Sequence, residues 1–340
     1  MPKRTMAFTQ HFQKLFSSCT ELFPDILGQD RAKEQIKSAL LTNRHILIMG
    51  PPGIGKTTLV KDIARLLPEL EVDVAGQKGK KVTKKGEDRF IRVQGSPDLT
   101  AEDLLGDIDP LKALQFGPLS KEAFEPGKIF KADKGILFFD EVNRCSEKLQ
   151  NALLQALEER AVTIGSYDVD LPADFIFIGT LNPQDSSTEK LSDAFLDRFD
   201  IITMDYPETR QIEQRIVVDK SEKIPVTFAP DLLVHVVDFV RSLRDKSKLS
   251  KMPSVRATMG IYERASALAF VRKKSSVELI DISDVIISVL AHRIELKPSL
   301  RYLQTAQEFI QQQFMTFVKA NQLSLSPDAG QSDKTESDYT

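Results

Sequence analysis

The eight residues 50–57 have the types and the spacing that can hold phosphate groups. Gly50, Gly55, Lys56 and Thr57 fill the fixed positions of the pattern GxxxxGK[ST]. Glycine lets the backbone wrap a phosphate with its N–H groups, the lysine can reach the outer phosphates, and the threonine hydroxyl can ligate Mg²⁺. We therefore predict that this segment binds the phosphates of a nucleotide.

Two carboxylates at the end of an apolar run form a second chemical element. Residues 135–139 read Gly-Ile-Leu-Phe-Phe, and Asp140 and Glu141 follow. A run that is apolar on both sides is typical of a buried parallel strand. In a phosphate-loop enzyme the first carboxylate at such a strand end holds Mg²⁺, and a second one can polarise the attacking water. Standing alone, the same run would be a strand that meets solvent.

A third polar side chain, Asn182, follows another apolar run at 175–181. Its amide would lie beside the γ phosphate if this strand neighbours the strand that leads into residues 50–57. The alternative is a turn residue before Pro183. Thr57 and Asp140 are the predicted metal ligands. The predicted nucleotide-binding residues are Gly50, Pro51, Pro52, Gly53, Ile54, Gly55, Lys56, Thr57, Thr58 and Asp140.

These residues need an α/β framework to position them, and the hydrophobic pattern predicts one. Residues 45–49 are an expected strand and 58–67 an expected helix, so the glycines connect a strand to a helix start. Breakers within 98–130 indicate an inserted loop or hairpin, and 161–174 fits a hairpin with a turn at 165–166. The lysines between residues 78 and 85 suggest a solvated loop, with contact to phosphates as the alternative.

Helical patterns replace strand patterns from residue 228 onward, which predicts a second, helical domain. The expected organisation is a helical segment at 1–27, an α/β core at 28–222 and an all-α domain at 223–322. Residues 323–340 are expected to form a disordered tail because they are rich in Ser, Asp, Gly and Lys.

Composition narrows the class of protein. The chain has 340 residues, 41% hydrophobic and 28% charged, which is ordinary for a soluble protein with two domains. The net charge of −3 gives no overall attraction to nucleic acid. Two cysteines and four scattered histidines indicate neither a disulfide framework nor a structural metal site. No membrane span or apolar leader is visible, so a cytoplasmic location is the simplest expectation.

The order of these motifs resembles the AAA+ ATPases. The phosphate loop, Asp140-Glu141 and Asn182 are similar to the phosphate-binding (Walker A), magnesium (Walker B) and first-sensor motifs of that superfamily. Asp197-Arg198-Phe199 and Ser254-Val255-Arg256-Ala257 resemble its arginine finger and second sensor. Within the superfamily the chain is similar to MoxR ATPases and to the ATPase subunit of magnesium chelatase. Segments 66–72 and 124–127 resemble the chelatase subunit, whereas 141–144, 153–160 and 162–165 resemble MoxR.

The resemblance implies an α/β core with a parallel sheet flanked by helices, followed by a small all-α lid. It implies hydrolysis of ATP with Mg²⁺ by a homo-oligomer, a hexameric ring, with Glu141, Asn182, Arg198 and Arg256 as catalytic residues. Arg198 as a surface ion pair and Arg256 as a surface charge are the alternatives. The output would be mechanical work on a protein partner, as a MoxR-like chaperone or a chelatase-type subunit. A nucleic-acid-dependent motor is the second candidate, and a monomeric nucleotide switch or kinase is the third.

Overall fold

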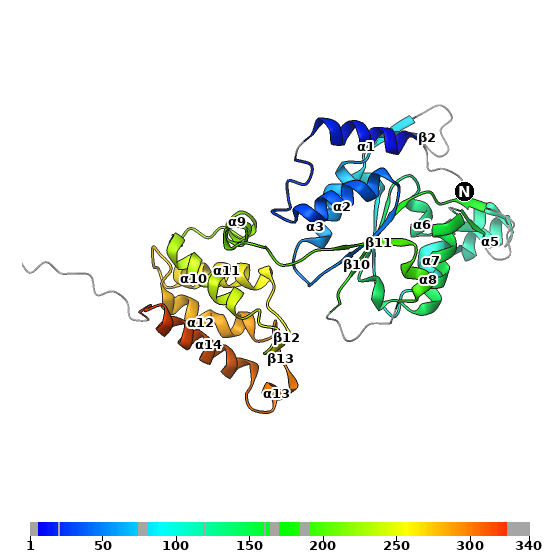
Figure 1. Ribbon diagram of the computed structural model, residues 1–340. Helices are drawn as coiled ribbons and strands as arrows, with labels where there is room; N and C mark the ends of the chain where they lie inside the picture. Colours follow the sequence, from blue (N-terminus) through cyan, green and yellow to red (C-terminus); the bar gives the residue numbers. More distant parts are fainter. Residues whose placement is uncertain are drawn as a thin grey trace, which may run out of the picture. The chain divides into compact units, whose positions relative to one another are not determined.

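The chain folds into two compact units, Met1–Tyr206 and Pro207–Thr340 (Figure 1). The structure is a computed structural model that describes residues 6–19, 21–73, 81–117, 120–159, 161–163, 170–183 and 191–324. Within these residues, no helix combines the length and the apolar character needed to cross a membrane.

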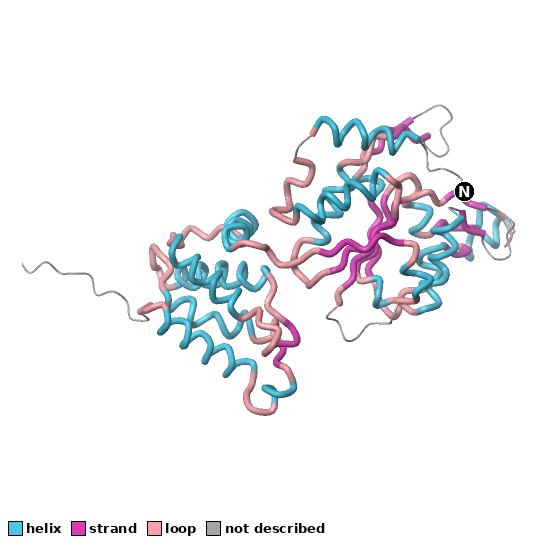
Figure 2. Tube along the Cα trace, viewed as in Figure 1, coloured by secondary structure: helices cyan, strands magenta, loops and turns pink. Residues whose placement is uncertain are grey.

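A five-stranded parallel sheet forms the centre of the first unit, as predicted (Figure 2). The strand order is β11-β1-β10-β7-β4, and every neighbouring pair is parallel. The hydrophobic pattern of the sequence did not predict the strand β11. The strands are β1 (His45–Met49), β4 (Phe90–Gln94), β7 (Ile136–Asp140), β10 (Ile176–Leu181) and β11 (Phe199–Thr203).

Alternating side chains of the sheet enter two separate cores. In β1, Ile46 and Ile48 pack on one face and Leu47 on the other, as the period of two in a strand requires. Helices α1 (Met6–Ser18), α2 (Asp30–Leu41) and α3 (Lys56–Arg65) cover the first face. The second face is covered by α4 (Ala101–Leu105), α6 (Lys128–Lys131), α7 (Glu147–Glu159) and α8 (Asp193–Leu196).

Two insertions interrupt this layered arrangement. Each contains an antiparallel strand pair, one within 98–130, where an inserted loop or hairpin is predicted, and one within 161–174, where a hairpin is predicted. Strands β5 (Gly106–Ile108) and β6 (Phe124–Pro126) pair antiparallel at the base of the first insertion. Between them lie α5 (Pro110–Phe116) and the short η2 (Lys121–Ala123). Strands β8 (Ala161–Thr163) and β9 (Asp170–Pro172) pair antiparallel in the second insertion. The expected turn at 165–166 lies outside the described residues.

The lysine-rich segment is not simply a loop, which corrects the expectation. Strand β2 (Leu70–Asp73) pairs antiparallel with β3 (Lys81–Lys84), and η1 (Glu87–Arg89) follows. The ladder pairs Leu70 with Lys84 and Val72 with Val82, so the lysines at 81 and 84 lie in a strand. Lys78 and Lys80 lie outside the described residues.

The second unit is mainly helical, with two differences from the prediction. The boundary lies at Tyr206–Pro207 and not at 222, because α9 packs on α10 and α11. A short antiparallel pair, β12 (Leu249–Lys251) with β13 (Glu295–Leu296), also accompanies the helices. The helices are α9 (Arg210–Lys220), α10 (Pro230–Ser242), α11 (Val255–Val271), α12 (Leu279–Leu290), α13 (Pro298–Arg301) and α14 (Ala306–Ala320).

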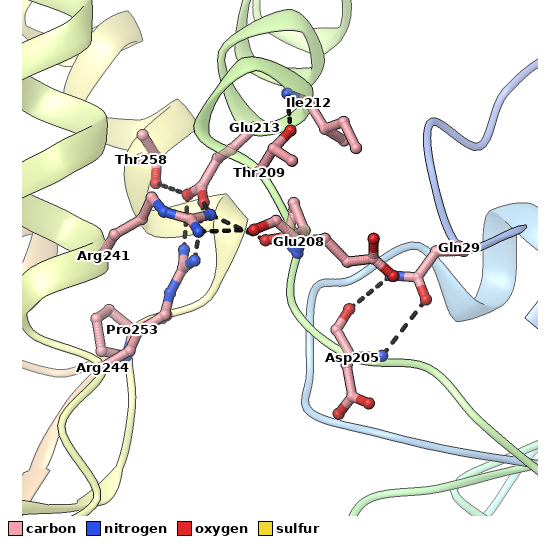
Figure 3. A network of polar contacts seen from close by, with 11 residues as sticks. Gln29, Asp205, Glu208, Thr209, Ile212, Glu213, Arg241, Arg244, Pro253 and Thr258 are labelled. Atoms are coloured by element: carbon pink, nitrogen blue, oxygen red, sulfur yellow. Dashed lines mark hydrogen bonds and ion pairs between the residues drawn. The ribbon is translucent and has the colours of Figure 1, made fainter. Parts of the chain in front are cut away.

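A buried carboxylate, Glu213 of α9, joins three parts of the second unit (Figure 3). Arg244 donates to both of its oxygens, at 2.8 and 2.6 Å, and the Thr258 hydroxyl of α11 donates at 2.8 Å. Arg241 lies 3.3 Å from the same carboxylate and also donates to the backbone oxygens of Pro207 and Glu208. The network therefore fixes the first residues of the unit to α9, α10 and α11.

We expect Glu213→Gln to destabilise the second unit by about 3–5 kcal/mol, because removing one partner leaves a buried charge uncompensated. Arg244 would be that charge, since its side chain is 8% exposed. The measurement is the urea midpoint for hydrogen exchange in peptides from α9 and α11 of the full chain.

Asp238→Asn is the matched control. It removes the 2.9 Å ion pair with Arg210, in which the two side chains are 36% and 44% exposed. Exposed pairs contribute about 0–1 kcal/mol, so the midpoint should move little. Equal midpoints for the two variants would contradict a central structural contribution from Glu213.

Candidate nucleotide site

The loop between β1 and α3 has the backbone geometry that its glycines allow. Gly53 and Gly55 have φ angles of 75° and 96°, in the region that favours glycine. A Cβ atom at Gly50 would lie 2.3 Å from the Met204 backbone oxygen, so only glycine fits against the end of β11. Helix α3 begins at Lys56, which directs its first N–H groups at this loop.

Lys56 folds back over the loop that precedes it. Its Nζ donates to the backbone oxygens of Gly50 and Pro51 at 2.6 and 2.9 Å. Thr57 and Thr58, in the same first turn of α3, are half-buried. The ammonium group and the helix N-terminus thus put positive charge at one position, as an anion-binding site requires.

Asp140 and Glu141 end β7 in different conformations. Asp140 is the last strand residue, and its side chain is 14% exposed. Glu141 is left-handed, with φ 57° and ψ 53°, which turns the chain sharply and separates the two carboxylates. Its Oε2 accepts a hydrogen bond from Gln94 at 3.2 Å and lies 3.3 Å from Arg144 Nε, in the short η3 (Val142–Arg144).

Thr180 of β10 holds both carboxylate residues in place. Its fully buried hydroxyl donates to Asp140 Oδ1 at 2.7 Å and accepts from the Glu141 backbone N–H at 2.8 Å. Thr180 is not among the residues predicted from the sequence. The available signal was a lone hydroxyl in the apolar run 175–181, on the same strand face as Ile176 and Ile178.

Arg92 and Gln94 of β4 were also missed. They lie on the same face as Thr180 and Asp140, the face that α3 covers, because Phe90, two residues before Arg92, packs with that core. Arg92 donates to Asp140 Oδ2 at 2.6 Å, and Gln94 donates to Glu141 as described above. The sequence alone did not indicate Arg92 or Gln94, since their contacts with Asp140 and Glu141 depend on β4 lying beside β7.

Gly95, the first residue after β4, contacts the backbone of both carboxylate residues, Asp140 and Glu141. The N–H of Gly95, the residue after β4, donates to the Asp140 backbone oxygen at 2.7 Å. A Cβ atom at Gly95 would lie 2.0 Å from the Glu141 backbone oxygen. No side chain can separate these two segments.

Asn182 follows β10, the strand between β1 and β7. The expectation that its strand neighbours the phosphate-loop strand is confirmed. Asn182 therefore lies between the loop at 50–57 and the two carboxylates, and its backbone oxygen accepts from Asn143 Nδ2 at 3.5 Å. Contact between its amide and a phosphate stays a prediction.

Arg198 lies at the opposite edge of the sheet from these residues. Strand β11 pairs Phe199 with His45 and Thr203 with Met49. Arg198 therefore lies at the amino-terminal end of β11, whereas the phosphate loop lies at the carboxyl-terminal end of β1. Five strand residues lie between the two positions, which makes six steps or about 20 Å at 3.3 Å per residue, and an arginine side chain is shorter than that. Arg198 donates to the Ala194 backbone oxygen at 2.7 Å and forms an ion pair with Glu158 of α7.

Arg256 belongs to the second unit. It lies in the first turn of α11, where Ser254 is the N-cap residue, and its side chain is exposed, whereas those of Val255 and Ala257 beside it are buried. An interaction of Arg256 with the phosphates of a bound nucleotide stays a prediction.

The residues present fit ATP with Mg²⁺. Glycine at positions 50, 53 and 55 leaves the loop without side chains that would fill a phosphate cradle. A threonine hydroxyl and a carboxylate, Thr57 and Asp140, are the hard oxygen donors that Mg²⁺ prefers. They would hold the metal, and Lys56 would contact the phosphates.

Comparison with known proteins supports the same assignment. Residues 45–199 match the AAA domain family (dynein-related subfamily), and residues 249–313 match the AAA lid domain family. The chain belongs to the AAA+ ATPases. It falls in the branch that contains MoxR chaperones and the ATPase subunits of magnesium chelatase.

Relatives in this branch align over most of their length. The chaperone MoxR1 of Mycobacterium tuberculosis is 29% identical, over 90% of this chain and 82% of that protein. Magnesium-chelatase subunit ChlI of Nephroselmis olivacea is 30% identical, over 81% of this chain and 89% of that protein. The solved structure of a RuvB mutant from Thermotoga maritima shares the fold, with a TM-score of 0.50 and 18% identity over 79% of this chain and 73% of that one.

We expect Thr180→Val to slow ATP turnover at least about tenfold. The change removes the hydroxyl between Asp140 and Glu141 with little change in volume, and an unpartnered buried polar group costs about 1–3 kcal/mol. Steady-state ATPase assays over a range of Mg²⁺ concentrations measure the effect. Thr180→Ser, which keeps the hydroxyl, should retain most activity, and equal rates for both variants and the wild type would show that the hydroxyl is dispensable.

Proposed function

We propose that this chain is a Mg²⁺-dependent ATPase that works as a homo-oligomeric ring and uses hydrolysis to remodel or assemble a protein partner. The observation that carries the proposal is the division of the predicted catalytic groups between two edges of one sheet. The phosphate loop, the carboxylates and Asn182 share the carboxyl-terminal edge, and Arg198 lies at the other.

Each residue at the carboxyl-terminal edge has a defined function in this proposal. Lys56 and the loop N–H groups bind the outer phosphates of ATP, and Thr57 and Asp140 hold the metal. Bound Mg²⁺ supplies positive charge that offsets the charge of the phosphates. Glu141 polarises the attacking water, and the Asn182 amide helps to orient it.

Arg198 acts on the neighbouring subunit in this proposal. A guanidinium is always charged and presents a planar fork of donors, so it can stabilise the charge that develops on the transferred phosphate. The distance of about a strand length from its own phosphate loop argues against action within one subunit. A ring brings the amino-terminal edge of one sheet to the carboxyl-terminal edge of the next.

An exposed apolar helix supports a protein partner. Helix α5 of the first insertion has no buried residue, and Leu111, Leu114 and Phe116 are 77%, 87% and 55% exposed. Exposed apolar surface of this kind marks interaction sites. A surface hollow beside α5 is lined by apolar and glycine residues, by one lysine, Lys131, and by five acidic residues: Glu102, Asp103, Asp107, Asp109 and Glu125. Because acidic residues outnumber the lysine, a partner segment with apolar and basic side chains would fit there. The chaperone and chelatase-subunit names of the relatives agree with a protein partner.

Mixing two inactive variants tests the ring. Lys56→Ala has a dead phosphate loop and an intact Arg198, whereas Arg198→Ala has an intact loop and lacks only the neighbour's arginine. We expect each alone to be nearly inactive, since arginine fingers contribute about 10³- to 10⁵-fold. When subunits exchange, some boundaries combine a working loop with a working arginine, and steady-state ATPase activity should partly return.

Co-assembly is checked by differential labelling and native mass spectrometry. The matched control is Lys56→Ala mixed with the double variant Lys56→Ala/Arg198→Ala, which cannot restore any boundary. A mixture of the two single variants that co-assembles and remains as inactive as this control would rule out action of Arg198 on a neighbour.

A trapped complex tests the apolar helix. Glu141→Gln should bind ATP and hydrolyse it about 10²- to 10⁴-fold more slowly, so that it retains a partner. We expect a full-length Glu141→Gln chain to capture a partner from cell extract only with ATP, and addition of Leu111→Ser/Leu114→Ser to remove the capture.

The control for the trapped complex changes two equally exposed apolar residues elsewhere. Tyr302→Ser/Leu303→Ser in the same Glu141→Gln background alters side chains that are 90% and 80% exposed in the second unit. It should leave capture intact. Undiminished capture by the Leu111/Leu114 variant would exclude α5 as the partner surface.

A further inference from the structure

Arg92 forms an ion pair with Asp140, the proposed metal-binding carboxylate. Its Nη2 lies 2.6 Å from Asp140 Oδ2, and Thr180 donates to the other oxygen, Oδ1. Asp140 is largely withdrawn from water, with 14% of its side chain exposed. Arg92 therefore supplies a positive charge at hydrogen-bond distance from this carboxylate in the nucleotide-free subunit.

A guanidinium and a divalent cation compete for one carboxylate. Mg²⁺ needs the charge and an oxygen of Asp140, and a second cation at hydrogen-bond distance would repel it. If Asp140 holds the metal, the guanidinium would have to leave Oδ2 or loosen its contact. Loading of the metal is therefore coupled to displacement of Arg92.

The surroundings of Arg92 permit this displacement. Strand β4 is at the edge of the sheet, and the Arg92 side chain is 50% exposed, so it can move toward solvent. The Oε1 atom of Gln94, 3.2 Å from the same Nη2, offers a neutral acceptor that remains when Asp140 turns to the metal. The arrangement differs from an ordinary surface ion pair, because Arg92 can move into solvent whereas Asp140 is largely buried.

We propose that Arg92 is a displaceable counter-ion of Asp140 that sets the Mg²⁺ concentration at which the site loads. The inference rests on the proposed function of the site. In the nucleotide-free subunit Arg92 neutralises Asp140, and Mg²⁺ entering with ATP takes over this charge. Arg92 is a positioning residue, since it acts on the metal through Asp140.

The test measures binding and not turnover. A fluorescent ATP analogue is titrated into Glu141→Gln and Glu141→Gln/Arg92→Gln at several Mg²⁺ concentrations, and again in excess EDTA. Arg92→Gln keeps hydrogen-bonding capacity and removes the charge. We expect the half-saturating Mg²⁺ concentration to fall about two- to fivefold, the range expected for a partly exposed ion pair, with affinity in EDTA unchanged.

Two controls define the charge effect. Arg92→Lys keeps the positive charge and should have a midpoint close to that of the parent chain. Arg210→Gln removes an ion pair of similar length, 2.9 Å to Asp238, in the second unit, and should leave the midpoint unchanged.

The outcomes separate this inference from the proposed function. If Arg92→Gln binds the nucleotide with an unchanged or raised Mg²⁺ midpoint, Arg92 does not compete with the cation and the inference is overturned. If the parent Glu141→Gln chain does not bind nucleotide with or without Mg²⁺, the proposed function fails first and the inference with it. A lowered midpoint in Arg92→Gln that Arg92→Lys does not share supports the counter-ion.

Discussion

The site depends on one constraint, which is that parallel strands end at the same edge of a sheet. Because β10 lies between β1 and β7, the phosphate loop, Asn182 and the two carboxylates are neighbours although they are far apart in sequence. The Thr180 hydroxyl uses this adjacency, since it can bond Asp140 and Glu141 only from the neighbouring strand. Any change in strand order would separate all of these groups.

The residues that sequence could identify are those whose own type and local spacing determine the chemistry. The phosphate loop and Asp140-Glu141 follow short apolar strands, so each could be recognised without knowledge of its neighbours. The lone hydroxyl of Thr180 indicates a polar position but not its partners, and Arg92 has no signal of its own, because the contacts of both depend on which strands pair and in which register. The same limit explains the misplaced domain boundary, since the assignment of α9 rests on its packing against α10 and α11.

Different kinds of interaction hold the two units together. In the first, apolar residues alternate between the two faces of the sheet and form two cores. In the second, the buried Glu213 adds a charged network that fixes the residues at its start, from Pro207. A buried ion pair contributes less to net stability than to uniqueness of arrangement in some proteins, which suits the residues that begin the second unit and are held to its helices.

The contact at Gly95 has a mechanical consequence. Side chains absorb small displacements by changing rotamer, but here backbone meets backbone, with a hydrogen bond to Asp140 and no room for a single added carbon atom beside Glu141. Movement of the carboxylate turn by a fraction of an ångström must therefore shift residue 95 and the segment that leads to α4. The carboxylate turn and the segment from Gly95 toward α4 are therefore coupled through backbone atoms alone.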